Sequence, residues 1–167
     1  MKGVQPRVKR TRRGDFQLKL PQVERDVLRS LPAQLRQLLG TDDPALERLF
    51  PPAYRDDPLA QADYEEMVHG ELISKKLTSI DVMEQTIDTE RLTEEQLLGW
   101  LGAINDLRLV LGTRLEVTEE MYEEEMPDDD ARAPMYAVFA YLGWLEGQVV
   151  EALSEGIDPA GQGDEDR

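Results

Sequence analysis

Two long segments of this chain carry apolar residues at helical spacing around nearly the whole circumference of a helix. One follows Thr93, and the other runs from about residue 132 to 155. A surface helix has a single apolar stripe, so helices of this kind must be covered on several sides. The sequence therefore predicts a mainly α fold, a single-domain helical bundle packed around these two helices. A chain of 167 residues has few other elements to cover them, so a homodimer interface is also predicted. The apolar positions are Leu97, Leu98, Trp100, Leu101, Ile104, Leu107, Val110 and Leu111 in the first segment and Met135, Tyr136, Val138, Phe139, Leu142, Leu145, Val149 and Leu153 in the second.

Short signals indicate where helices begin and end. Thr93 and Gln96 form a capping box, because the Thr hydroxyl accepts from the amide three residues later and the Gln side chain reaches back. Pro134 suits the first turn of the last helix, where a missing amide costs nothing. Earlier in the chain, Pro32 predicts an interruption, with Ser30 capping a second helical segment.

Two Asp-Pro pairs predict further helices. Asp43–Pro44 begins a short helix that ends at about residue 50, and Asp57–Pro58 begins a longer one. The longer helix extends to Ile87, either unbroken or restarting near Ser79, and the pattern does not decide between the two. Its predicted apolar face includes Tyr64, Met67, Val68, the aliphatic stem of Glu71, and Leu72.

The N-terminal residues instead alternate between apolar and polar side chains. Phe16, Leu18 and Leu20 are separated by polar residues, which is the period of a half-buried strand. Val8 lies in a similar preceding run, and Gly14 is placed to form a turn between the two. We expect a β-hairpin at about residues 5–20, within a single domain that spans residues 1–156. The Gly- and acid-rich residues 157–167 are expected to form a disordered acidic tail.

Composition excludes several classes of chemistry. The chain has no cysteine, which excludes disulfides, thiolate metal sites and thiol redox chemistry, and His69 is its one histidine. It also lacks a glycine-rich phosphate loop, and the acidic run at residues 128–130 lacks the ligand spacing of a calcium loop. We therefore expect no catalytic residue, no cofactor and no metal ligand, and a protein that binds a macromolecular partner and is not an enzyme.

A cytoplasmic location without membrane contact is the expectation. The basic N-terminal residues lack the apolar core of a secretory signal. No apolar run approaches the roughly 18 residues that would cross a bilayer.

Charge is unevenly distributed along the chain. Residues 1–40 carry a net charge of +7 and residues 41–167 carry −23. An acidic body repels nucleic acid, so such contact is confined to a basic cluster formed by Lys9, Arg10, Arg12 and Arg13. Four phosphate contacts would give a salt slope of about −3.6, a loss of roughly 150-fold in affinity between about 50 and 200 mM salt. The cluster predicts at most weak, unspecific DNA binding, and the alternative is a charged edge hairpin without ligand.

Four polar residues interrupt the most apolar helix: Asn105, Asp106, Arg108 and Arg114. A buried charge is tolerated only when it is paired, so Asp106 and the two arginines require partners of opposite charge. One interpretation is an ion-pair network that fixes the register of the helices. The other is a pocket for an anion or a protein partner, built around the two arginines.

Three segments resemble one known family in the same order. They are Leu49–Tyr54 (LFPPAY) followed by Asp56–Pro58 (DDP), Trp100 with Asn105–Leu115 (NDLRLVLGTRL), and Tyr141–Gly147 (YLGWLEG). Over residues 5 to 155 the chain is similar to an actinobacterial family of domains of unknown function that are typically encoded beside the adaptor of the Clp protease. This family includes the actinomycete oxidative-stress regulators.

The resemblance implies a role in transcriptional regulation with a protein partner from the transcription machinery. Those regulators are thought to sense oxidants through a cysteine pair, which this chain lacks, so thiol sensing is not carried over. The alternative is an accessory of Clp-dependent proteolysis that binds protein and has no DNA contact.

Overall fold

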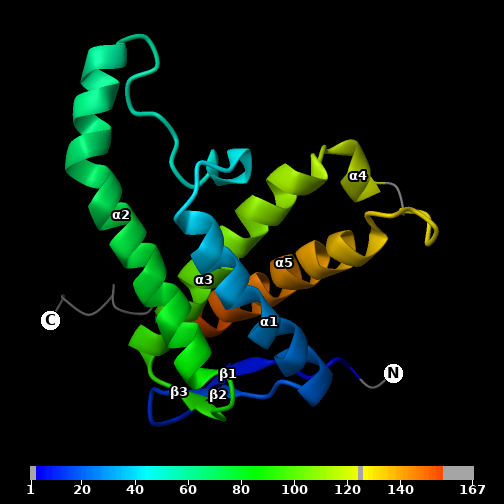
Figure 1. The fold of residues 1–167 in the computed structure, drawn as a ribbon. Coiled ribbons are helices and arrows are strands. Elements are labelled where there is room, and N and C mark those ends of the chain that lie inside the picture. The colour runs from blue at the N-terminus through cyan, green and yellow to red at the C-terminus, as the bar shows by residue number, and fades with distance from the viewer. Residues whose placement is uncertain (1–2, 124–125, 156–167) are drawn as a thin grey trace, which may run out of the picture.

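The computed structural model describes residues 3–123 and 126–155 and confirms the mainly α fold (Figure 1). One hydrophobic cluster extends through the molecule from Val8 to Ala152. The tail predicted at 157–167 lies outside the described residues. Among the helices in the described ranges, none has both the length and the apolar content needed to cross a membrane. The elements, in chain order, are β1 (Val8–Arg10), β2 (Phe16–Leu18), α1 (Gln22–Leu39), the 3₁₀ helix η1 (Pro44–Leu46), α2 (Pro58–Thr86), β3 (Arg91–Leu92), α3 (Glu94–Leu115), α4 (Glu120–Glu123) and α5 (Ala133–Ser154).

Helix α3 lies at the centre and contacts α1, α2, α5, η1 and β3, as its all-round apolar surface predicts. The predicted capping box is confirmed: the Gln96 amide donates to Thr93 Oγ1 at 3.1 Å, and the Thr93 amide donates to Gln96 Oε1 at 2.9 Å. Trp100 is fully buried, and its indole Nε1 donates to Thr86 Oγ1 at 2.7 Å. This hydrogen bond joins α3 to the end of α2 and satisfies the polar atom of the largest core side chain.

The predicted hairpin is confirmed, and a third strand adds to it. β1 pairs antiparallel with β2, and β2 pairs with β3 in the order β1-β2-β3. Gly14 adopts a φ of 91° in the turn, a conformation that glycine tolerates best. The register aligns Lys9 with Gln17 and Gln17 with Arg91. Because paired residues lie on the same face of a sheet, these three form a row on the face opposite the buried side chains of Val8, Phe16, Leu18 and Leu92.

The predicted interruption at Pro32 is wrong, because helix α1 continues through this residue to Leu39. Ser30 does not cap a second segment, because its hydroxyl donates to the Val27 carbonyl at 2.7 Å. An interior proline costs about 3 kcal/mol. Pro32 shares one buried face with Leu28, Leu35 and Leu39, and burying the leucines contributes roughly 2 kcal/mol each. Tertiary packing therefore outweighs the local penalty.

Helix α2 is a single unbroken helix of 29 residues, which settles the alternative at Ser79. Its buried side chains are confined to the C-terminal part, from Ile80 onward. Of the predicted apolar face in its first half, Met67 was wrong, because it is 78% exposed, whereas Tyr64, Val68 and Leu72 are partly buried. This half projects away from the bundle, at the end opposite the sheet (Figure 1).

Candidate functional site

Asp106 is the most deeply buried of the polar residues of α3. Its carboxylate accepts from Lys76 Nζ of α2 at 2.9 Å, and its side chain is 8% exposed. Burial raises the pKa of Asp106 above its ordinary value of 3.8, and the ammonium group of Lys76 opposes this rise. The pair joins α3 to α2 at the point where α2 enters the core.

Arg108 connects α3 to α5. Its guanidinium donates to Glu146 Oε2 at 2.7 Å and lies 5.5 Å from the centre of the Phe139 ring. Gly143 makes this arrangement possible, because a Cβ atom there would lie 3.3 Å from Arg108 Nε. Gly143 therefore leaves room for a side chain of α3.

Arg114 and Asn105 do not join these pairs. Arg114 lies 3.7 Å from Asp43, the residue that caps η1, and Asn105 is exposed. Asp106, Arg108 and Arg114 of α3 thus pair with α2, with α5 and with the segment before η1, one partner each. They are not brought together around a common cavity, so the geometry favours helix positioning over a ligand pocket.

The basic cluster is divided by the fold. Arg10 points inward, with its guanidinium carbon 4.7 Å from the centre of the Phe16 ring and a nitrogen 3.5 Å from Glu94. Lys9 lies on the outer face of the sheet, and Arg12 and Arg13 lie exposed in the hairpin turn. Three of the four predicted residues therefore remain available for an external anion.

A second polar cluster, which the sequence did not indicate, holds the N-terminal residues to the bundle. Glu24 of α1 accepts from Arg7 at 2.8–3.2 Å and from the Tyr141 hydroxyl at 2.9 Å. The hydrogen bonds from Arg7 lower the pKa of Glu24, while burial and the neighbouring Glu24 carboxylate raise the pKa of Tyr141. Arg7 also lies 5.4 Å from the centre of the Trp144 ring. These residues are up to 137 positions apart, as Arg7 and Trp144 show, so no local pattern links them.

A groove of about 530 Å³ separates the first half of α2 from the segment that precedes it. The Phe50 and His69 rings lie with their centres 4.9 Å apart, and Glu66 and Asp42 flank them. The sequence did not identify this site, although Phe50 belongs to a motif that carries the resemblance. We call it the acidic groove, and define it by Asp42, Phe50, Tyr64, Glu65, Glu66 and His69.

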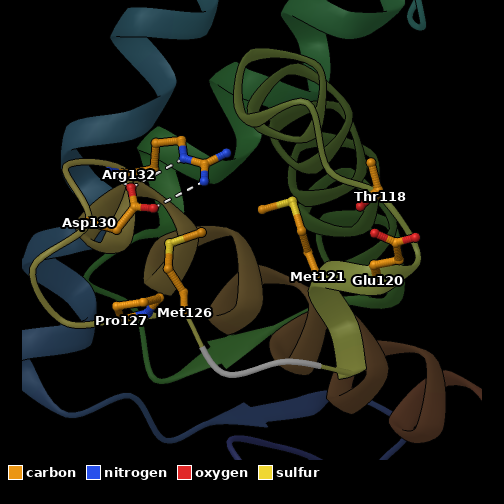
Figure 2. A pocket seen from close by; sticks show the side chains of 7 residues that line it. All are labelled: Thr118, Glu120, Met121, Met126, Pro127, Asp130 and Arg132. Atoms are coloured by element: carbon orange, nitrogen blue, oxygen red, sulfur yellow. Dashed lines mark hydrogen bonds and ion pairs between the residues drawn. The ribbon is translucent and has the colours of Figure 1, made fainter.

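A smaller pocket of about 170 Å³ lies where α4 leads toward α5 (Figure 2). Met121 and Met126 line it from two sides, and the Arg132 guanidinium donates to Asp130 at 3.0 Å. Within residues 3–123 and 126–155, no group of three or more His, Asp or Glu side chains is placed to hold a metal ion. The lone histidine, His69, instead lies in the acidic groove.

Comparisons with known proteins agree with the resemblance. The family described as "Domain of unknown function (DUF2017)" matches residues 4–153. Proteins named "Oxidative stress regulator AosR" from Mycobacterium tuberculosis and Mycobacterium bovis are 31% identical over 129 residues, 66% of this chain and 58% of theirs. A relative from Mycobacterium leprae is 28% identical over 130 residues, 67% of this chain and 59% of its own. The chain thus spans about three fifths of the length of these relatives. No solved structure matches the chain.

Proposed function

This chain belongs to the DUF2017 family, and from that premise we propose that it is a regulatory protein that acts by binding macromolecules and not by catalysis. The relatives named as oxidative stress regulators support a regulatory role. Under this proposal the protein works in the cytoplasm with a protein partner of the transcription machinery. Because the chain has no cysteine, the proposal does not include thiol sensing by the chain itself.

One observation supports the binding mode. The chain has a net charge of −16, yet Lys9, Arg12 and Arg13 project from the sheet and its turn, and none of them has a carboxylate partner in the described residues. In the same residues, Asp106, Arg108 and Arg114 of α3 are paired with neighbouring helices or with the cap of η1. In this proposal the protein partner provides specificity, and the three cations add a weak contact to nucleic-acid phosphates.

The expected salt dependence follows from the number of phosphate contacts that Lys9, Arg12 and Arg13 can make. Three phosphate contacts give a slope of about −2.7, so affinity for a DNA duplex should fall roughly 40-fold between about 50 and 200 mM salt. Replacing Arg12 and Arg13 together with alanine should reduce the slope to about −0.9 and the loss to roughly fourfold. Fluorescence anisotropy with a labelled duplex of arbitrary sequence measures both quantities.

A matched control removes the same charge elsewhere. Arg55→Ala combined with Lys75→Ala changes two exposed cations on and beside α2, and should leave the slope of the wild-type protein unchanged. If the Arg12 and Arg13 double variant binds DNA with the wild-type slope, or if the wild-type protein binds no DNA at low salt, the nucleic-acid contact is wrong. A role as an accessory of Clp-dependent proteolysis would then be the remaining interpretation, and it stays a prediction.

A further inference from the structure

We propose that the acidic groove binds an arginine-containing basic segment of a protein partner. The groove lies on the first half of α2, at the opposite end of the molecule from the sheet (Figure 1). The proposal rests on the protein-binding role stated above, but not on the contact between the sheet and nucleic acid. The two sites can therefore fail independently.

In the first half of the helix that forms one wall of the groove, none of the side chains that the structure describes is fully buried. Leu59 and Met67 are 81% and 78% exposed, although a helix in a globular protein normally buries its large apolar residues. Helical segments of fewer than about 12–15 residues are marginal without tertiary contacts. The first half of α2 thus depends on its continuation into the core, and a segment bound in the groove would add contacts along it.

Aromatic rings give the groove surfaces for a planar cation. Phe50, Tyr64 and His69 line the groove, and the Phe50 and His69 rings lie with their centres 4.9 Å apart. Phe50 already has a cation beside it, since Lys76 Nζ lies 5.8 Å from its ring centre. Guanidinium groups stack on aromatic faces and pair with carboxylates in a fixed geometry, which makes arginine a better fit than lysine.

Charge complementarity selects the occupant. Residues 42–72 contain nine acidic residues and two arginines, a net charge of −7. In the described part of the chain, Asp42 and Glu66 form no ion pair or side-chain hydrogen bond, and Glu65 accepts only from Gln61 at 2.9 Å. A neutral apolar segment would leave these carboxylates next to an uncharged surface, whereas a basic segment pairs with them.

The binding test uses a labelled nine-residue peptide in which four arginines alternate with leucine and alanine. Fluorescence anisotropy at about 150 mM salt should show binding to the wild-type protein. The double variant Asp42→Asn and Glu66→Gln should weaken binding about 10-fold, because it removes two exposed charge pairs with the peptide. These substitutions keep the shape of exposed side chains, so the fold is preserved.

Two controls make the result specific. Glu95→Gln with Glu151→Gln removes the same charge from exposed positions on α3 and α5 and should leave the affinity unchanged. A peptide with lysines in place of the arginines should bind more weakly. Equal weakening in both double variants, or equal binding of a peptide with glutamines at the four positions, would overturn the proposal.

A second copy of this chain is the competing occupant, since its own Arg12 and Arg13 are exposed. Sedimentation velocity distinguishes the two. If the protein self-associates, and both the Asp42/Glu66 and the Arg12/Arg13 variants abolish self-association, the groove belongs to a homo-oligomer and the proposed partner segment is wrong. Peptide binding by a monomeric protein supports the proposal.

Discussion

Replacing Trp100 with alanine should lower the free energy of unfolding by about 4 kcal/mol, the typical cost of truncating a large buried aromatic side chain. Trp100 is fully buried where α3 packs against α2, and removing it leaves a cavity between these helices. The same change leaves the Thr86 hydroxyl without the indole donor at 2.7 Å. Urea unfolding followed by circular dichroism measures the loss without depending on tryptophan fluorescence.

The second tryptophan provides the matched control. Trp144 of α5 is 38% exposed, and Trp144→Ala should cost only about 1 kcal/mol, as less apolar surface is buried there. A third variant, Thr86→Val, keeps the core volume but leaves the indole N–H unpaired, and should cost about 2 kcal/mol. Equal losses for the two tryptophan variants would contradict the central position of α3.

The variant Lys76→Met should lower the free energy of unfolding by about 3 kcal/mol at neutral pH, because it leaves the Asp106 carboxylate buried without a counter-charge. Methionine keeps most of the apolar stem of lysine, so the loss reports the ammonium group. The side chains of Lys76 and Asp106 are 19% and 8% exposed, so water can solvate the unpaired Asp106 carboxylate only weakly. Lys75→Met changes an exposed neighbour on the same helix and should leave stability within about 0.5 kcal/mol of wild type.

The loss in Lys76→Met should depend on pH in a defined direction. Burial already raises the pKa of Asp106 above 3.8, and removing Lys76 removes the charge that opposes this rise. A folded-state pKa above the unfolded value favours the protonated carboxyl in the folded protein. The penalty is therefore small below pH 3.8 and grows as the pH rises through the folded-state pKa. A loss that is the same below pH 3.8 as at pH 7 would show that Asp106 is not the group left unpaired.

The sequence predicted the helices and the hairpin whose signals lie within a few neighbouring residues. The capping box at Thr93 and the all-round apolar surfaces of α3 and α5 are readable because each signal lies within a few turns. The hairpin is readable from the alternation around Phe16 and Leu18. β3 was missed because a two-residue strand has no detectable period. Pro32 was misread because the burial that retains it in α1 comes from other elements.

The polar residues were predictable only in part. The sequence required partners for Asp106, Arg108 and Arg114, but their identities depend on tertiary packing. Nothing in the local pattern indicated that Asn105 is exposed while its neighbour Asp106 is buried. Nor did it indicate that Arg10 is partly buried while Arg12 and Arg13 in the turn are exposed. These side chains and their partners, Lys76, Glu146, Asp43 and Glu94, lie 30 to 84 residues apart in the chain.

Amide chemical-shift mapping by NMR tests the central claim most directly. The claim is that the buried charged residues of α3 hold the helices together, while the acidic groove and the basic residues of the sheet bind ligands. Titration with the arginine peptide should shift amides of residues 42–72, and titration with a DNA duplex should shift those of residues 8–19. The amides from Asp106 to Arg114 should stay in place in both experiments, since α3 holds the helices together and contacts neither ligand. Shifts centred on Arg108 and Arg114 in either titration would contradict this account.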